Sequence, residues 1–271
     1  MPHPTTNLAV FCDFENIALG VRDAKYAKFD IDRVLERLLL KGSIVVKKAY
    51  CDWERYKEFK GAMHEASFEM IEIPHLRISG KNSADIRLVV DALDLCYTKS
   101  HVDTFVIVSG DSDFSPLVSK LRENNKTVIG VGVKSSTSDL LIANCDEFIF
   151  YDDLVREQEK KRQRSRRRTA KPASTSAQKS AGKTEDDRKQ EAFDLVLDTI
   201  EALVDERDQD EKIWGSMVKQ ALKRQKPGFN ETYHGFRSFS ELLEEAAQRK
   251  LLELEADQKS GGYIIKRFAR D

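Results

Sequence analysis

The length, composition and charge of the chain exclude several classes of protein. At 271 residues the chain exceeds one average domain, which favours two compact units and a connection between them. The formal net charge is only −1, no apolar run is long enough to cross a bilayer, and the start lacks a cationic region followed by an apolar signal core. We therefore expect a cytoplasmic protein with two domains.

The cysteines support neither a zinc site nor a disulfide framework. They are widely separated along the chain and form no Cys-x-x-Cys pair. We expect reduced and mostly buried thiols at all four positions, which are Cys12, Cys51, Cys96 and Cys145.

The region 1–153 alternates short β-branched apolar runs with longer amphipathic stretches. The spacing predicts strands over 8–12, 44–50, 68–73, 104–108, 127–133 and 147–150. It predicts helices over 31–40, 53–66, 84–97 and 114–123. Because the strands are apolar on both faces and alternate with helices, we expect an α/β domain with a mainly parallel sheet covered on both sides.

Acidic residues follow the first and the fourth predicted strands. Asp13 comes directly after the first strand, and Ser109, Gly110, Asp111 and Asp113 come after the fourth. The commonest winding of such a sheet places these two strands side by side, with a crevice outside their carboxyl ends. Gly110 allows a tight exit from the strand. The acidic side chains should therefore face one another in the crevice.

Asp85 adds a further carboxylate, because it opens a strongly apolar helix after the third strand and is expected to point into the same crevice. Carboxylates that converge in a partly desolvated cleft raise one another's pKa values unless a cation lies among them. Oxygen-only ligation suits Mg²⁺ or Mn²⁺. Such an ion activates water and stabilises a leaving oxygen. The pattern therefore indicates phosphodiester hydrolysis. The expected metal ligands and catalytic residues are Asp13, Asp85, Asp111 and Asp113.

Each of these residues also has a purely structural explanation. Asp113 precedes a helix and could serve only as its N-cap, a role worth about 1 kcal/mol. Asp85 could be a first-turn carboxylate favoured by the helix dipole, and Asn16 could be a turn former. Several strand-end acids at one predicted crevice favour a metal site over these separate explanations.

Further residues are candidates for supporting roles. Asn16 and Ser109 lie beside the predicted ligands in the sequence. Asp91 is expected on the same helix as Asp85, but a separation of six residues places the two on different faces of that helix. Asp91 is therefore at most a residue that supports the ligands. Lys81 and Lys134 are candidates for contacts with substrate phosphates.

The segment 154–184 is expected to be a linker. It is rich in basic residues between Arg156 and Arg168 and then consists mainly of Ala, Ser, Thr, Lys and Gln. Such a stretch cannot bury enough surface to offset its ordering entropy, although it could begin as a continuation of the preceding helix. A contact with polyanions and a solvated tether without a partner are both compatible with this composition.

The region 185–271 is helical at first and then changes to a hairpin-like pattern around Gly261 and Gly262. Three helices and a β-wing form a winged-helix outline. Tyr233 and Phe236 could stack on bases, although aromatic residues in so small a domain are more often part of the core. Phosphate contacts are expected from basic residues, namely Lys219, Lys223, Arg224 and Arg237.

Four strings in the first region resemble the NYN family of PIN-like nucleases, particularly its LabA-like branch. They are VFCDFEN from Val10, KNSADIRLVVD from Lys81, VIVSGDSDFSPL from Val106 and ANCDEFI from Ala143. The resemblance implies a PIN-like Rossmannoid fold and metal-dependent ribonuclease activity. It also implies that the four aspartates and Asn16 are the matching site residues. Many relatives carry a Lys-Gly step before the acidic helix, whereas here Asn82 follows Lys81.

The second region resembles the OST-HTH or LOTUS domain. The supporting strings are GFRSFSELL from Gly235 and GYII from Gly262, and the match covers most of 185–268. The resemblance implies RNA binding or docking of a protein partner.

The leading hypothesis is an endoribonuclease whose C-terminal module and basic linker hold RNA. A non-catalytic RNA-binding or regulatory adaptor that retains the nuclease fold is the alternative, and the complete set of four carboxylates argues against it. DNA or a small phosphate ester also stays possible as the substrate, because a bound cation does not distinguish one sugar from another. Formation of a homodimer also stays open.

Overall fold

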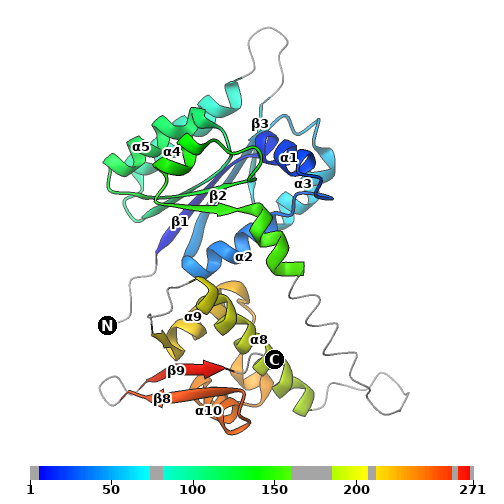
Figure 1. Cartoon of the computed structure of the whole chain (residues 1–271), viewed down its shortest axis with the longest axis vertical. Helices are drawn as coiled ribbons and strands as arrows, with labels where there is room; N and C mark the ends of the chain where they lie inside the picture. The colour runs from blue at the N-terminus through cyan, green and yellow to red at the C-terminus, as the bar shows by residue number, and fades with distance from the viewer. Residues whose placement is uncertain (1–5, 74–81, 160–184, 207–211, 258–261, 269–271) are drawn as a thin grey trace, which may run out of the picture. The chain divides into compact units, whose positions relative to one another are not determined.

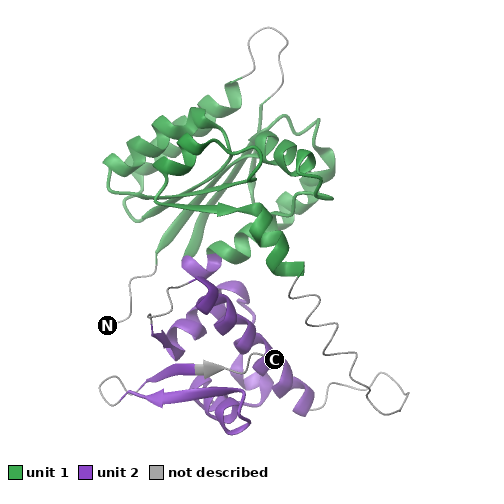
Figure 2. Cartoon of the chain, in the orientation of Figure 1, with its two compact units in different colours: residues 1–38, 42–172 green, residues 39–41, 173–271 purple. Residues whose placement is uncertain are grey.

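The computed structural model describes residues 6–73, 82–159, 185–206, 212–257 and 262–268 (Figure 1). The chain divides into two compact units, one of residues 1–38 and 42–172 and the other of residues 39–41 and 173–271 (Figure 2). None of the described helices is long and apolar enough to span a bilayer.

A six-stranded parallel sheet forms the centre of the first unit, in the order β3-β2-β1-β4-β5-β6 (Figure 1). The predicted fold class and the pairing of the first strand with the fourth are both confirmed. The strands are β1 (Asn7–Asp13), β2 (Ser43–Cys51), β3 (Glu69–Glu72), β4 (Thr104–Val108), β5 (Thr127–Gly132) and β6 (Glu147–Phe150).

Helices cover both faces of this sheet. On one face the core includes residues of α1 (Phe14–Asp23), α2 (Ile31–Lys41) and α3 (Lys57–Glu65), and on the other those of α4 (Ser83–Thr98), α5 (Ser115–Glu123) and α6 (Asp139–Asn144). Strand β1 alternates between the two cores: Val10 and Cys12 belong to the first, and Ala9 and Phe11 to the second. This alternation follows from the period of two along a strand, so apolar residues in succession bury both faces.

Two local structures differ from the sequence-based expectation. Helix α1 begins at Phe14 with no loop after β1, because the Asp13 side chain accepts a hydrogen bond from the Asn16 amide and caps the helix. Helix α3 begins at Lys57 rather than near Trp53. Trp53 is instead buried in a turn, where its indole nitrogen donates to the Ile71 carbonyl oxygen at 3.2 Å.

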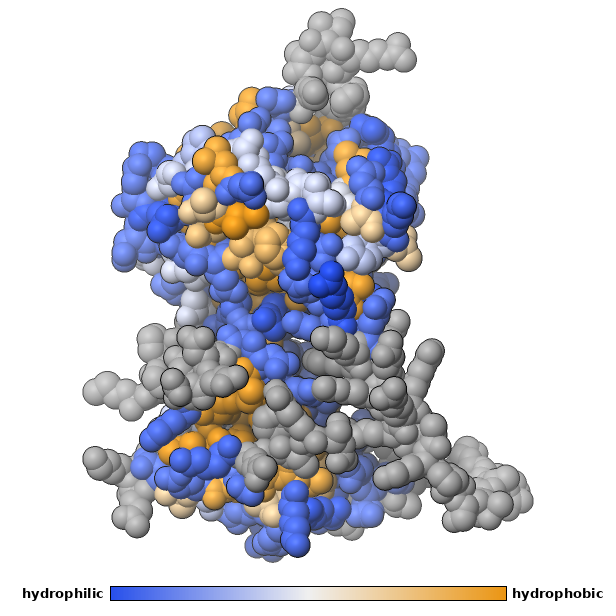
Figure 3. Space-filling model, viewed as in Figure 1, coloured by the Kyte–Doolittle hydropathy of each residue, from blue (hydrophilic) through white to orange (hydrophobic). Residues whose placement is uncertain are grey.

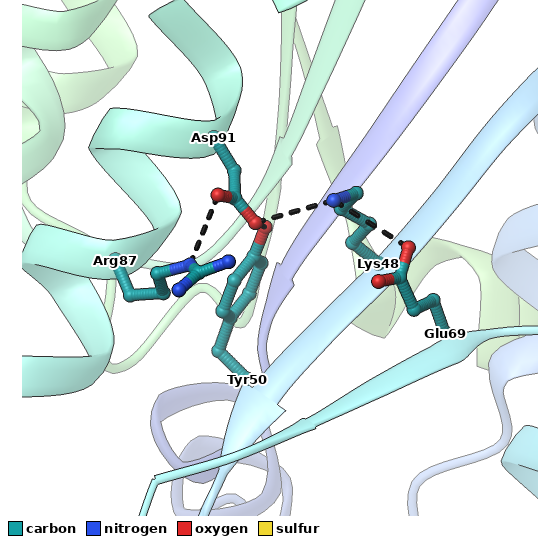
Figure 4. A network of polar contacts seen from close by, with 5 residues as sticks. All are labelled: Lys48, Tyr50, Glu69, Arg87 and Asp91. Atoms are coloured by element: carbon teal, nitrogen blue, oxygen red, sulfur yellow. Dashed lines mark hydrogen bonds and ion pairs between the residues drawn. The ribbon is translucent and has the colours of Figure 1, made fainter. Parts of the chain in front are cut away.

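A polar network fixes α4 against β2 (Figure 4). Oδ2 of Asp91 accepts hydrogen bonds from the Tyr50 hydroxyl at 3.0 Å and from Nζ of Lys48 at 3.2 Å. Its Oδ1 accepts from Nε of Arg87 at 3.0 Å, and Lys48 also pairs with Glu69 on β3 at 3.4 Å. Burial acts to raise the pKa of Asp91, but these hydrogen bonds and cations outweigh it, so the pKa lies below its ordinary value.

We predict that Asp91→Asn lowers the free energy of unfolding at pH 7 by about 1–3 kcal/mol, because Lys48 and Arg87 lose their anionic acceptor. The native pKa of Asp91 is depressed, so its contribution is complete above the ordinary value of 3.8 and is lost as pH falls below it. Urea unfolding of wild type and variant at pH 7 and pH 3 measures both effects. The difference between the proteins should shrink at pH 3.

The control for this prediction is Asp94→Asn on the same helix. Asp94 is exposed, and no described residue forms an ion pair with it, so the change should stay within about 0.5 kcal/mol. An equal loss of stability in both variants would contradict the assigned role of the network.

The second unit combines three helices with a small antiparallel sheet of order β7-β9-β8. Its elements are α8 (Glu185–Glu206), β7 (Ile213–Trp214), α9 (Gly215–Gln225), η2 (Glu231–His234), α10 (Phe239–Gln248), β8 (Leu252–Ala256) and β9 (Tyr263–Phe268). The predicted helices and hairpin are therefore present, with β7 as an additional strand. One core joins them, and it includes Phe193, Val196, Ile200, Val218, Leu222, Phe236 and Leu242.

The predicted linker lies mostly outside the described residues. Residues 151–159 are helical, so the preceding domain does continue as a helix into the start of the predicted segment. The remaining part, 160–184, is not among the described residues.

Candidate acidic site at the edge of the sheet

The carboxyl ends of β1 and β4 lie side by side. Cys12 is the register partner of Val108, so Asp13 and Ser109 are the next residues along two neighbouring parallel strands. Asp13 is both the last residue of β1 and the N-cap of α1. Its side chain is therefore held at the edge of the sheet by the strand and by the first turn of the helix.

Two hydrogen bonds join the segment after β4 to the end of β1 and the first turn of α1. In the first, the buried Ser109 hydroxyl donates to Oδ2 of Asp13 at 3.0 Å. Within the segment after β4, the Asp111 amide donates to the same hydroxyl oxygen at 3.2 Å. Oδ1 of Asn16 accepts from the Gly110 amide at 2.9 Å. Ser109 and Asn16, which were predicted to support the ligands, therefore contact the acidic segment directly.

Gly110 allows the close approach of a third segment to this site. A Cβ built on Gly110 would lie 2.6 Å from the carbonyl oxygen of Ser136, which is a backbone atom that cannot move away cheaply. The Gly110 carbonyl oxygen also accepts a hydrogen bond from the Ser138 amide at 2.9 Å. The segment that follows β5 thus packs against the turn between β4 and Asp111.

Asp111 and Asp113 occupy a short 3-10 helix, η1 (Ser112–Phe114), just before α5. Oδ1 of Asp111 accepts from the Asp113 amide at 3.0 Å, so Asp111 is the N-cap of η1. The sequence-based alternative gave a capping role to Asp113. In the structure, Asp111 takes that role and the Asp113 side chain is exposed.

Asp85 lies in the first turn of α4, as the sequence predicts. Its side chain is partly buried, and its pKa is raised by burial and by the negative charges of Asp111, Asp113 and Glu15. The first turn of a helix normally favours a carboxylate. The raised pKa shows that the neighbouring carboxylates and burial outweigh that effect.

The electrostatic centre of the site is Asp13, which is 7% exposed. Burial and the negative charges of Asp85 and Asp111 raise its pKa to about 7, against the lowering effect of hydrogen bonds from Asn16 and Ser109. Within the described part of the chain, no lysine or arginine forms an ion pair with Asp13, Asp85, Asp111 or Asp113. The four carboxylates therefore repel one another without a compensating protein cation in that part of the chain.

The carboxylates suit a hard divalent cation in chemistry, since all the donors are oxygen atoms. No three His, Cys, Asp or Glu side chains in the described ranges converge closely enough to hold an ion in their present positions. Mg²⁺ commonly binds through one or two carboxylates, several waters and substrate phosphate, so a preformed cage of three protein ligands is not a requirement. The donor set therefore fits such an ion.

Other predicted site residues have different partners. Asp91 belongs to the network with Lys48, Tyr50 and Arg87 (Figure 4). Nζ of Lys134 pairs with Asp153 at 2.7 Å. Lys81 lies outside the described residues.

The basic candidates of the second unit differ in their exposure. Lys223 and Arg237 are exposed, Lys219 pairs with Glu231 at 2.9 Å, and the partly buried Arg224 has a pKa lowered by burial. Of the two roles considered for Phe236, the structure shows the core role and not base stacking, because this side chain is 2% exposed and belongs to the core. Tyr233 is 56% exposed, and the Arg188 guanidinium lies 5.1 Å from the centre of its ring.

Two features near the acidic residues were not predicted. Glu15, in the first turn of α1, contributes to the raised pKa of Asp85 and pairs with Arg55 at 3.1 Å. The sequence signal was its position two residues after Asp13. An open hollow of about 620 Å³ also adjoins Asp113, and three serines contribute half of its lining: Ser112, Asp113, Ser115, Pro116, Ser119 and Leu140.

Comparison with known proteins assigns the first unit to a family. Residues 7–152 match the NYN domain, which is more than half of the chain, so the chain belongs to the NYN domain family. The NYN domain is part of a PIN-like nuclease superfamily. The parallel sheet and its flanking helices agree with that fold.

Two curated relatives each match about half of the chain. An uncharacterized protein of Methanocaldococcus jannaschii is 29% identical over 117 residues, which is 43% of this chain and 45% of that protein. The meiosis regulator and mRNA stability factor 1 of Xenopus tropicalis is 26% identical over 150 residues, or 55% of this chain and 9% of that protein. The chain thus spans less than half the length of either relative.

A solved structure supports the fold of the first unit. The crystal structure of a protein of unknown function from Vibrio parahaemolyticus has a TM-score of 0.50 and 27% sequence identity. The match covers 57% of this chain and 98% of the Vibrio protein.

We predict that Asp13→Asn stabilises the protein at pH 8 without divalent cations, by about 2 kcal/mol, because the variant removes a charge that is buried and is repelled by Asp85 and Asp111. The native pKa of Asp13 is raised from 3.8 to about 7, so the native state holds its proton more tightly than the unfolded state. The free energy of unfolding of wild type should therefore fall as pH rises from 3.8 to about 7. In Asp13→Asn, the free energy of unfolding should depend less steeply on pH over this range. Urea unfolding between pH 4 and pH 8 measures this.

Saturating Mg²⁺ or Mn²⁺ should raise the melting temperature of wild type and have little effect on Asp13→Asn. Asp103→Asn is the control, since Asp103 is exposed and precedes the amino end of β4. It should keep the response of wild type to the cations. An Asp13→Asn protein that is less stable than wild type at pH 8 in the absence of cations would show that the carboxylates do not repel one another as described.

Proposed function

We propose that the chain is a metal-dependent endoribonuclease that hydrolyses RNA phosphodiester bonds at the acidic site of its NYN domain. The observation that supports this function best is the gathering of Asp13, Asp85, Asp111 and Asp113 at one edge of the sheet, where burial and the charges of Asp85 and Asp111 raise the pKa of Asp13 to about 7. An uncompensated group of carboxylates lowers stability, and proteins seldom keep one without a function.

Asp13, Asp85, Asp111 and Asp113 would hold the Mg²⁺ or Mn²⁺ ion. When bound, the ion would lower the pKa of water and stabilise negative charge on the leaving oxygen of the phosphodiester. In the hydrolysis, the oxygen of water forms a new bond to phosphorus, the bond from phosphorus to the leaving oxygen breaks, and that oxygen takes up a proton.

The residues around the carboxylates would keep the site in place for this reaction. Ser109 orients the Asp13 carboxylate through a 3.0 Å hydrogen bond, and Asn16 holds the Gly110 amide at 2.9 Å. Both bonds link β1 and α1 to the segment that carries Asp111. A carboxylate set on two neighbouring strands and a helix is thereby kept in one arrangement, as a metal site requires.

The hollow beside Asp113 would receive the substrate next to the scissile bond. Its volume of about 620 Å³ lies within the range of small-molecule sites, so it can take a nucleotide. Ser112 and Ser119 in its lining offer hydroxyl groups that suit ribose and phosphate.

RNA is the substrate we favour. The Xenopus relative is by its name an mRNA stability factor, and its match covers 55% of this chain.

The second unit would hold the RNA as an OST-HTH or LOTUS-like module. Its three helices and antiparallel hairpin suit that outline, and Lys223, Arg237 and the exposed Tyr233 offer phosphate and base contacts. Lys219 and Arg224 are weaker candidates, because the former is paired and the latter is partly buried. Docking of a protein partner is the competing role of this module.

We predict that the wild-type protein cleaves labelled single-stranded RNA in the presence of Mg²⁺ or Mn²⁺ and stops when a chelator is added. Asp111→Asn should reduce the cleavage rate by at least ~10–100-fold. This is the loss typical for a residue that only supports a metal ligand, and Asp111 is a proposed ligand itself. A gel assay with internally labelled RNA, with single-stranded DNA in parallel, measures the rate, the sugar preference and the internal cutting.

Asp103→Asn serves as the matched control, because it makes the same chemical change at the other end of β4. It should cleave at the wild-type rate. Cleavage by Asp111→Asn at the wild-type rate would contradict the assigned site. A wild-type protein that binds RNA without cutting it under any of these conditions would favour the non-catalytic adaptor.

We predict that Lys223→Gln with Arg237→Gln weakens RNA binding and lowers the slope of log affinity against log salt by about 1.4, or ~0.7 for each lost phosphate contact. Fluorescence anisotropy in the presence of chelator measures binding without cleavage. Lys99→Gln, an exposed lysine that follows α4, should leave the slope unchanged. An unchanged slope in the double variant would instead favour protein docking by the second unit.

A further inference from the structure

The outer surface of α4 carries a stripe of large apolar side chains. Ile86 is 63% exposed, Val90 55% and Tyr97 65%, and the partly buried Leu93 lies between the last two. These four residues are hereafter the α4 stripe. Figure 3 shows apolar residues, in orange, among hydrophilic ones on the surface of the first unit.

The spacing of the α4 stripe is that of a helix seam. Its members are separated by four, three and four residues, so they form one narrow line along the helix. The buried side of the same helix uses a different set, Leu88, Ala92 and Cys96, which packs on the sheet. Leu93 also packs against this core, and the Tyr97 hydroxyl accepts a hydrogen bond from Nδ2 of Asn124 at 3.4 Å. Ile86 and Val90 lie outside the core clusters of the described residues, so packing within those residues does not explain them.

The stripe is self-complementary when two copies of α4 run antiparallel. Ile86 of one copy then meets Tyr97 of the other, and Val90 meets Leu93. The same arrangement brings Arg87, which flanks the stripe, next to Asp94 on the other copy, and two-fold symmetry makes this pair twice. Arg87 is 57% exposed and Asp94 is exposed, so both are accessible to a partner.

We propose that the α4 stripe is a homodimer interface in which two copies of this chain pair their α4 helices in antiparallel orientation. Opposite charges on the flank of an apolar seam select both the partner and its orientation. A second copy of the chain supplies the apolar seam and the charges in the required register, which is why we favour it over another partner.

The interface would leave both acidic sites in place. The network of Asp91, Lys48 and Tyr50 holds α4 on the sheet, so the stripe is presented on a fixed helix. In the antiparallel register, the two copies of Asp85 lie on opposite sides of the two-fold axis. At a rise of ~1.5 Å per residue, they are separated by about 20 Å along the helices.

Sedimentation velocity of the full chain over a range of concentrations tests the proposal. Wild type should shift from the 31.0-kDa chain mass towards twice that mass as its concentration rises. Ile86→Glu with Val90→Glu should stay at the chain mass at every concentration, with the circular dichroism and melting temperature of wild type because both side chains are exposed. Val45→Glu, at a 45% exposed apolar residue on β2, should dimerise as wild type does.

Charge variants test the register. Asp94→Arg alone and Arg87→Asp alone should each weaken dimerisation at least 10-fold, because each places like charges together twice. An equimolar mixture of the two should recover the dimer, since each Arg then meets an Asp on the other chain. Wild type that stays monomeric, a dimer that survives Ile86→Glu with Val90→Glu, or a mixture that does not recover would each overturn the proposal.

Discussion

The repulsion among four carboxylates at the carboxyl ends of β1 and β4 is the constraint on which the site depends. Burial is the largest cause of the raised pKa of Asp13, and repulsion by Asp85 and Asp111 raises it further. Hydrogen bonds from Ser109 and Asn16 only partly offset it. A divalent cation would change the sign of the interaction from repulsion to attraction, so the group is poor as a structural device and suitable as a metal site.

The rest of the first unit keeps this unfavourable arrangement in place. The strands that bring Asp13 and Ser109 together are buried on both faces, and a shift of register would expose their apolar residues. Helix α4 brings Asp85 to the same edge, and the Asp91 network fixes that helix on β2. The outer surface of α4 exposes Ile86, Val90 and Tyr97 of the α4 stripe, while Leu93 also packs against the core. One helix therefore combines a site residue, a structural network and the proposed dimer interface.

The sequence predicted the large features because they follow from hydrophobic period and strand order. Apolar runs with defined ends located the strands, and the common winding of a parallel sheet placed β1 beside β4, so Asp13 and Asp111 were expected at the same edge. Side-chain partners were not predictable in this way. The pairing of Lys134 with Asp153, the burial of Phe236 and the capping by Asp111 depend on rotamers and on contacts between distant segments. Helix α1 was missed because the side-chain cap that starts it is also a predicted metal ligand.

The central claim is that the four aspartates bind a divalent ion together. The most direct measurement is anomalous diffraction from crystals of the full chain soaked in Mn²⁺, with data collected near the manganese absorption edge. We expect one strong peak in the anomalous difference map among Asp13, Asp85, Asp111 and Asp113, and its loss in crystals of Asp111→Asn. A wild-type map with no peak at this edge of the sheet, at Mn²⁺ concentrations that saturate any binding seen in solution, would contradict it.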